Sequence, residues 1–328
     1  MPSVTASAPS KVMLLGDHAV VYGYPCIVTA VDLRVQVSAS LLDTRDVTIH
    51  AAGLAQPFAA TVEQLVSSQA LPREVEFVAC ALRTFWKAYG ATFGVEIVTR
   101  SQFSQSYGLG SSSAVTVATM KALAEAVGSA TDRDRIFRLS YETVLEVQGG
   151  IGSGFDVAAA TYGGTLYFVT GGTVIHPLAE PVLPLVIGYS GVKARTTVYV
   201  RQVARLRQRF PQFVEFIMAS IGKVVDDAKR SLEQGDYELF GQYMNLNQGY
   251  LHALDVSTPE LDSLISAVRQ NGAYGAKLSG AGGGDCMIAL VGEESRATVE
   301  TAIRGSGIPG AEVLAVRTGA DGVRVEPS

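Results

Sequence analysis

The residues best suited to chemistry form a stretch of glycines and serines, Gly108-Leu109-Gly110-Ser111-Ser112-Ser113, just before an apolar segment with helical spacing. Glycine lets the backbone turn sharply and approach a ligand without a Cβ atom in the way. The first turn of a helix adds N–H groups that lack intrahelical acceptors, and these favour anions. Serine hydroxyls can cap the helix or reach a phosphate-bound Mg²⁺. The stretch indicates a phosphate site, and a plain loop capped by serines is the alternative interpretation.

Several better-known sites are excluded by spacing. No lysine follows the last glycine of the stretch, so it is not a Walker loop, and its glycines lack the dinucleotide-binding spacing. The three serines do not lie in a G-x-S-x-G elbow, which argues against a serine hydrolase. The four histidines lack metal-ligand spacing, and no H-E-x-x-H occurs.

A second glycine-rich stretch lies far along the chain, at Gly280-Ala281-Gly282-Gly283-Gly284. Glycines at this density destabilise a chain unless a backbone has to approach something closely. A tight turn between a helix and a strand would also need them. Two such stretches in one chain favour a single composite anion site over two unrelated loops.

Two charged residues complete the set of candidates. Asp156 follows a glycine-rich turn, 152–154, and begins a small-residue helical segment. A carboxylate held there is a candidate general base, and an N-cap is the alternative interpretation. Lys11 starts a strand-like run, where an isolated lysine is most often exposed to solvent.

The composition restricts the class of protein. The chain has 328 residues, 48% hydrophobic and 17% charged, which fits an enzyme of two ordinary domains. The net charge is −5 and the basic residues are dispersed, so we expect no nucleic-acid partner. Three cysteines without a C-x-x-C pair favour a reducing compartment. The sequence shows neither a membrane span nor a signal peptide, so we expect a cytoplasmic protein.

The elements that must position these residues follow from hydrophobic periodicity. Runs that alternate or are rich in β-branched residues predict strands at 11–15, 26–39, 47–50 and 95–99. Apolar residues at helical spacing predict helices at 74–89, 114–127, 132–147, 196–209, 212–233 and 237–254. Strands and helices interleave, so the fold class is α/β or α+β.

Taken in order, three segments resemble the three signatures of the GHMP kinases. Residues 8–23 resemble the opening of the mevalonate kinase family, residues 108–112 its phosphate loop, and residues 277–284 its third signature. The segments around 196–211 and 244–256 also resemble helices of that family. The resemblance extends over nearly the whole chain.

The resemblance implies an α+β fold in two domains. Residues 1–180 would form an N-terminal ribosomal-protein-S5-like α/β domain, and residues 181–328 a C-terminal ferredoxin-like α/β domain. It also implies an ATP-dependent kinase that uses Mg²⁺ and phosphorylates a small molecule. A homodimer is left open.

The resemblance also implies roles for individual residues. Asp156 would take the proton of the acceptor hydroxyl, and Lys11 would steady that carboxylate and the developing negative charge. The phosphate loop would hold ATP with Gly108, Leu109, Gly110, Ser111, Ser112 and Ser113. Substrate-binding positions would be Asp17, His18, Lys193, Arg195, Thr196, Gly280, Ala281 and Gly282. Ser112 would also touch the magnesium ion.

The sequence departs from the mevalonate kinase pattern in places that bear on the site. Asp17 replaces the usual glutamate. The expected acidic magnesium ligand falls at about Val144, so Glu146 is its provisional substitute and Glu142 the other choice. The segments 150–160 and 284–286 resemble phosphomevalonate kinases more closely.

Besides another GHMP kinase or a related decarboxylase, three functions stay open at this point. The preferred acceptor is mevalonate, and phosphomevalonate is the alternative. A non-catalytic GHMP-fold sensor is the third interpretation, although a pure binding protein need not keep both Lys11 and Asp156.

Overall fold

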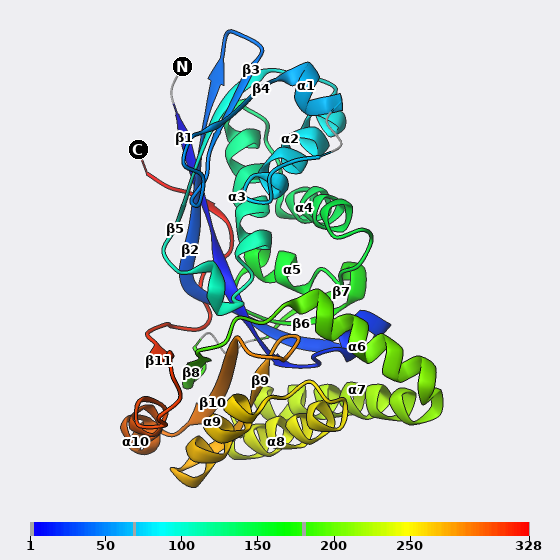
Figure 1. The fold of residues 1–328 in the computed structure, drawn as a ribbon, viewed down its shortest axis with the longest axis vertical. Helices are drawn as coiled ribbons and strands as arrows, with labels where there is room; N and C mark the ends of the chain where they lie inside the picture. The colour runs from blue at the N-terminus through cyan, green and yellow to red at the C-terminus, as the bar shows by residue number, and fades with distance from the viewer. Residues whose placement is uncertain (1–2, 68–69, 179–181, 328) are drawn as a thin grey trace.

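The larger of two sheets carries most of the N-terminal half of the chain (Figure 1). The computed structural model describes residues 3–67, 70–178 and 182–327. Within them the sheet has the strand order β12-β1-β2-β5-β3-β4, and β6 and β7 extend it beside β2. All neighbouring strands within this sheet pair in antiparallel fashion except β3 and β5, which are parallel. The strands are β1 (Val4–Leu15), β2 (Cys26–Leu42), β3 (Asp46–His50), β4 (Phe58–Thr61), β5 (Gly94–Ser101), β6 (Thr165–Val169), β7 (Val174–Leu178) and β12 (Arg324–Val325).

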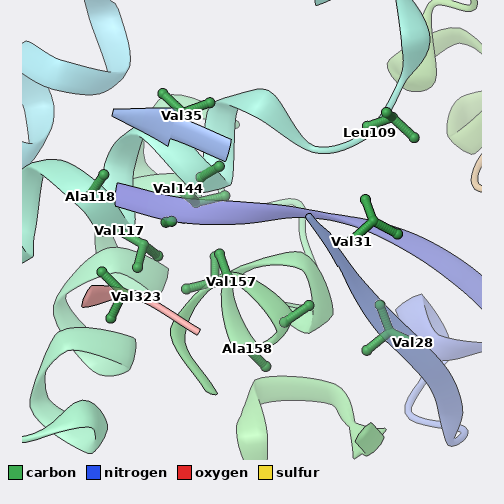
Figure 2. Close-up of a cluster of buried hydrophobic side chains, with 14 of the residues drawn as sticks. Val28, Val31, Val35, Leu109, Val117, Ala118, Val144, Val157, Ala158 and Val323 are labelled. Atoms are coloured by element: carbon green, nitrogen blue, oxygen red, sulfur yellow. The ribbon is translucent and has the colours of Figure 1, made fainter. Parts of the chain in front are cut away.

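Helices gather on one side of this sheet (Figure 1). They are α1 (Val62–Ser67), α2 (Glu76–Tyr89), α3 (Ser111–Ala126), α4 (Arg133–Val147) and α5 (Phe155–Tyr162). Small residues on α3 and α5 let both helices approach β1 and β2 closely. Figure 2 shows the resulting core, in which Val117 of α3 and Val157 of α5 meet valines of β2.

The smaller sheet has the order β11-β8-β10-β9, and all its pairs are antiparallel. Its elements follow one another along the chain as β8 (Leu185–Ser190), α9 (Pro259–Gln270), β9 (Ala273–Ser279), β10 (Cys286–Val291), α10 (Glu293–Arg304) and β11 (Ala311–Leu314). Counted in that succession, the strands lie in the order 4-1-3-2, which confirms the expected ferredoxin-like arrangement. Between β8 and α9 the chain inserts α6 (Thr196–Arg209), α7 (Pro211–Glu233) and α8 (Tyr237–Ala253).

Strand β10 joins the two halves of the molecule. Its residues are all buried, and alternate side chains enter different hydrophobic clusters. Ile288 and Leu290 pack into the core shared with the larger sheet, whereas Met287 and Ala289 face the cluster that includes residues of α9 and α10. An unbroken apolar run is typical of a strand covered on both faces.

The predicted boundary between residues 180 and 181 lies outside the described residues, so the division into domains stays a prediction. Near its C-terminal end the chain returns to the larger sheet, where β12 pairs with β1 at Ala6 and Ser7. Arg34 reinforces this return, since its guanidinium donates to the carbonyls of Asp321 and Gly322 at 2.7 and 2.8 Å. In the part of the chain that the structure describes, no helix has the length and apolar character to cross a membrane.

Candidate active site

Lys11 and the Gly108–Ser113 stretch lie against one another. Lys11 is 7% exposed on β1, and its Nζ donates to the Gly108 carbonyl at 3.3 Å. Its backbone N–H donates to the Leu109 carbonyl at 3.0 Å. Gly110 is the N-cap of α3 with φ 80°, and a Cβ added there would lie 3.1 Å from Cε of Lys11. Lys11 is therefore buried against the phosphate-loop candidate, and the solvent-exposed interpretation was wrong.

Asp156 lies in the first turn of α5, close to the start of α3. Its Oδ2 accepts from the Ser113 hydroxyl at 2.7 Å, and its Oδ1 accepts from the backbone N–H of Val157 at 3.0 Å. The N-cap of α5 is Gly154, so the alternative interpretation of Asp156 as an N-cap was wrong. The hydroxyl of Ser113 is turned toward this carboxylate, which the sequence did not reveal.

Lys11 and Asp156 carry opposite charges and both lie close to Cys26. Both act on the same buried thiol. Burial raises the pKa of Cys26 well above its usual value, the carboxylates of Asp17 and Asp156 raise it further, and Lys11 lowers it. The Lys11 ammonium also lies 5.4 Å from the centre of the Phe155 ring, next to Asp156 in the chain. Lys11 and Asp156 therefore belong to one site.

The second glycine-rich stretch, Gly280–Gly284, is held against the turn that follows β1. Asp17 accepts from the backbone N–H of Gly280 at 2.7 Å through Oδ1 and pairs with Lys277 at 2.6 Å through Oδ2. The side chains of this ion pair are wholly buried. Nε2 of His18 lies 3.0 Å from the Ala281 carbonyl. Burial lowers the pKa of both His18 and Lys277, and the Asp17 carboxylate opposes each shift.

These contacts refine the predicted substrate positions on this side. Because both oxygens of Asp17 are engaged by the protein, its position suits holding the Gly280 backbone in place. His18 keeps φ 60°, which is costly for a residue other than glycine and is most often found at functional sites. A Cβ added at Gly280 would meet nothing within 4 Å, whereas one at Gly282 would overlap the Val256 carbonyl. Gly280 therefore borders open space, and Gly282 is required by packing.

The remaining substrate candidates lie where α6 begins. Lys193, Arg195 and Thr196 are all exposed. Arg195 is the N-cap residue of α6 and makes no side-chain cap. The ammonium of Lys193 lies 3.4 Å from Oδ1 of Asp285. A Cβ added at Gly108 would overlap that same carboxylate, so Asp285 lies directly on the phosphate loop.

Glu146, the candidate acidic magnesium ligand, lies on α4 where that helix faces α2. It is half-exposed and lies 3.8 Å from Arg83 of α2. Glu142 likewise pairs with Lys87 of α2, at 3.5 Å. Leu145 of α4 and its C-cap residue Gln148 approach Gly152, in the loop before Asp156, and the Tyr141 hydroxyl of α4 donates to the Gly152 carbonyl at 2.9 Å. Nowhere in residues 3–67, 70–178 and 182–327 do three acidic, histidine or cysteine side chains form a metal-binding group.

Comparison with known proteins agrees with this geometry. Residues 76–164 match the family model of the GHMP kinases N terminal domain, and residues 228–308 match GHMP kinases C terminal. The mevalonate kinase of Pyrococcus abyssi is 37% identical over 98% of this chain and 98% of its own length. The chain belongs to the GHMP kinase family. It is thus an ATP-dependent small-molecule kinase whose curated relatives of this similarity are mevalonate kinases.

Solved structures extend the comparison. The Methanococcus jannaschii mevalonate kinase is 28% identical, covers 95% of this chain and 97% of its own, and has a TM-score of 0.81. The Lin0012 protein from Listeria innocua covers all of both chains with a TM-score of 0.87, at 24% identity. The second likeness shows the GHMP kinase fold alone.

The hydrogen bond from Ser113 to Asp156 predicts a measurable effect on this kinase. Ser113→Ala should lower kcat by roughly 10- to 150-fold, because a hydrogen bond to a charged group contributes about 1.5–3 kcal/mol and orients the carboxylate. KM for ATP should change less than about twofold, since the change leaves the backbone of the phosphate loop intact. Steady-state kinetics at saturating acceptor would measure both constants.

Thr116→Ala is the matched control, because the Thr116 hydroxyl is buried on the same helix and donates to the Ser112 carbonyl at 2.8 Å instead. A Ser113→Ala enzyme with raised KM for ATP and normal kcat would place the hydroxyl on the nucleotide rather than on Asp156.

Proposed function

We propose that this kinase transfers the terminal phosphoryl group of ATP to the 5-hydroxyl of mevalonate, giving 5-phosphomevalonate and ADP. The observation that carries the proposal is the convergence of Lys11, the Gly108–Ser113 stretch and Asp156 at the start of α3. The names of the curated relatives support the choice of acceptor.

The nucleotide side of the site rests on the start of α3. Residues 111–113 form its first turn, whose N–H groups lack intrahelical acceptors and favour phosphate oxygens. Gly108 and Gly110 both have positive φ, so the backbone can turn toward the phosphates with no Cβ in the way. This region suits a polyphosphate, and ATP would supply the transferred phosphoryl group there.

The acceptor side rests on Asp156 and Lys11. Asp156 would accept the proton of the attacking hydroxyl, while the Ser113 hydroxyl and the Val157 N–H keep its two oxygens oriented. Lys11, held at Gly108, would offset negative charge as the hydroxyl oxygen attacks phosphorus. His18 and Thr196 would contact the acceptor, and the Gly280–Ala281 backbone would close beside it.

Magnesium belongs to the same proposal. The hydroxyl of Ser112, in the first turn of α3, would hold the ion together with phosphate oxygens. Bound there, the ion would neutralise phosphate charge during transfer. Glu146 is directed at α2 and makes a poor second ligand, so the acidic ligand predicted for the ion finds no support at that position.

Phosphomevalonate is the second candidate acceptor, because two exposed cations, Lys193 and Arg195, precede α6 near the site. An ATP-consumption assay with mevalonate and 5-phosphomevalonate side by side would decide between them. We expect the higher kcat/KM for mevalonate. A value at least tenfold higher for 5-phosphomevalonate would overturn the choice of acceptor.

Arg195→Ser gives an independent reading of the acceptor. With mevalonate as the acceptor, the change should leave kcat/KM for it nearly unaltered, since Arg195 faces solvent. An enzyme that binds the phosphate of phosphomevalonate through Arg195 should instead lose about 1.5–3 kcal/mol of transition-state binding for that substrate. Arg201→Ser, which removes another exposed arginine from α6, is the control.

A further inference from the structure

Lys193, predicted to bind the acceptor, pairs with a carboxylate that packs on the phosphate loop. Its ammonium lies 3.4 Å from Oδ1 of Asp285, and its side chain is 46% exposed. The same Asp285 oxygen accepts from the backbone N–H of Ala194 at 2.9 Å. The lysine therefore lies over Asp285, with room for its flexible stem to move.

Asp285 in turn is built into the start of the phosphate loop. Its carboxylate occupies the space that a Cβ at Gly108 would need, and a Cβ there would lie 2.7 Å from its own Cβ. The neighbouring Cys286 thiol donates to the Tyr107 carbonyl at 3.2 Å. The backbone of Asp285 is fixed on both sides, since its N–H donates to Val192 at 2.7 Å and its carbonyl accepts from Ser190 at 2.9 Å.

Two lysines consequently flank the same turn. Lys11 reaches the Gly108 carbonyl from β1, while Lys193 reaches the carboxylate packed on Gly108 from the segment before α6. The charges of both lysines act on the buried Cys286 thiol. Burial raises its pKa, Asp285 and Glu312 raise it further, and Lys11 and Lys193 lower it.

The negative charge of Asp285 beside the phosphate loop needs a compensating positive charge. A carboxylate 13% exposed at the edge of an anion-binding turn would repel incoming phosphates unless a cation offset its charge. Lys193 provides that charge. An ammonium with three donors can also contact a carboxylate and a phosphate oxygen together.

We propose that Lys193 binds the polyphosphate of the nucleotide rather than the acceptor, and that Asp285 holds Lys193 beside the Gly108–Ser113 stretch for this purpose. The proposal rests on the proposed function only in requiring that this stretch receives nucleotide phosphates. It is independent of which acceptor is phosphorylated.

The test is a binding series on the full-length chain, using adenosine, AMP, ADP and the non-hydrolysable AMP-PNP with isothermal titration calorimetry. Lys193→Met keeps the length of the side chain and removes its charge. We expect its Kd to rise at least tenfold for ADP and AMP-PNP and less than twofold for adenosine. Lys223→Met is the control, because Lys223 is an exposed lysine on α7 that pairs with Asp227 in the next helical turn.

Steady-state kinetics complete the test by separating the two substrates. Lys193→Met should raise KM for ATP and leave KM for the acceptor within twofold. An unchanged Kd across the nucleotide series, or a rise in KM confined to the acceptor, would overturn the proposal. A wild-type enzyme that binds ADP but phosphorylates neither mevalonate nor phosphomevalonate would refute the proposed function and leave the binding result intact.

Asp285→Asn tests the partner. Asparagine keeps an oxygen for the Ala194 N–H but removes the ion pair that holds Lys193 beside the loop, so the Kd for ADP should rise, by less than in Lys193→Met. An unchanged or lower Kd for ADP, in a variant whose melting temperature matches wild type, would count against the positioning role of Asp285. Lys193→Met is a separate variant, and the side chain it replaces is half-exposed. Its result therefore stands even if Asp285→Asn does not fold.

Discussion

Asp156→Asn is expected to lower kcat by about 10²–10⁴-fold, the usual loss when a positioned base is removed. The asparagine amide cannot take the proton of the acceptor hydroxyl at neutral pH. Its oxygen can still accept one of the two hydrogen bonds that Ser113 and Val157 donate to the carboxylate, so the start of α5 should persist. Product formation in reactions quenched at set times would measure turnover, and nucleotide titration would measure ATP affinity separately.

ATP affinity should remain near the wild-type value in that variant, because Asp156 meets α3 through a hydroxyl and not through the backbone of the phosphate loop. Asp226→Asn is a suitable control, since that carboxylate accepts from the Tyr167 hydroxyl at 2.8 Å on the exposed side of α7. Near-normal turnover by folded Asp156→Asn protein would show that another group takes the proton.

Gly110→Val should abolish measurable nucleotide binding. Gly110 caps α3 with φ 80°, and its Cβ position lies 3.1 and 3.2 Å from Cε and Cγ of Lys11. A valine would press its methyl groups on Lys11 and would strain the turn that exposes the first N–H groups of the helix. Titration with ATP, alongside circular dichroism to confirm folding, would measure the effect.

Gly90→Val is the control that separates the effect of backbone strain from the effect of crowding Lys11. Gly90 also has positive φ, at 64°, and also borders a helix, but a Cβ there would meet nothing within 4 Å. It should lose some stability and keep its affinity for ATP. If folded Gly110→Val bound ATP as wild type does, the role of this turn in phosphate binding would have to be abandoned.

Periodicity and local chemistry were enough to predict most elements of this protein. The helix expected at 196–209 is α6, with the same bounds, and those expected at 132–147 and 212–233 differ from α4 and α7 by one residue at the start. Local rules suffice there because the amphipathic face of a helix repeats within one contiguous stretch of the chain. The strand expected at 11–15 was too short, since β1 begins at Val4, where serine and threonine alternate with apolar residues.

The three glycine-rich segments were also recognisable in the sequence, and with them the family. Glycine is required where a backbone turns with positive φ or where another group approaches closely, as at Gly108 and Gly110. These requirements leave a local signature. The short η1 helix (Ala19–Tyr22) left none, because it follows a histidine with positive φ that no local rule predicts.

Which side chains meet was decided only by the tertiary structure. Successive residues of a helix point about 100° apart, so a small change in helix rotation decides whether Glu146 reaches Arg83 or the loop before Asp156. The contacts of Ser113 with Asp156, Lys277 with Asp17, and Lys193 with Asp285 join residues far apart in sequence. Each depends on how whole helices and strands pack, and no residue near either partner in the chain encodes that packing.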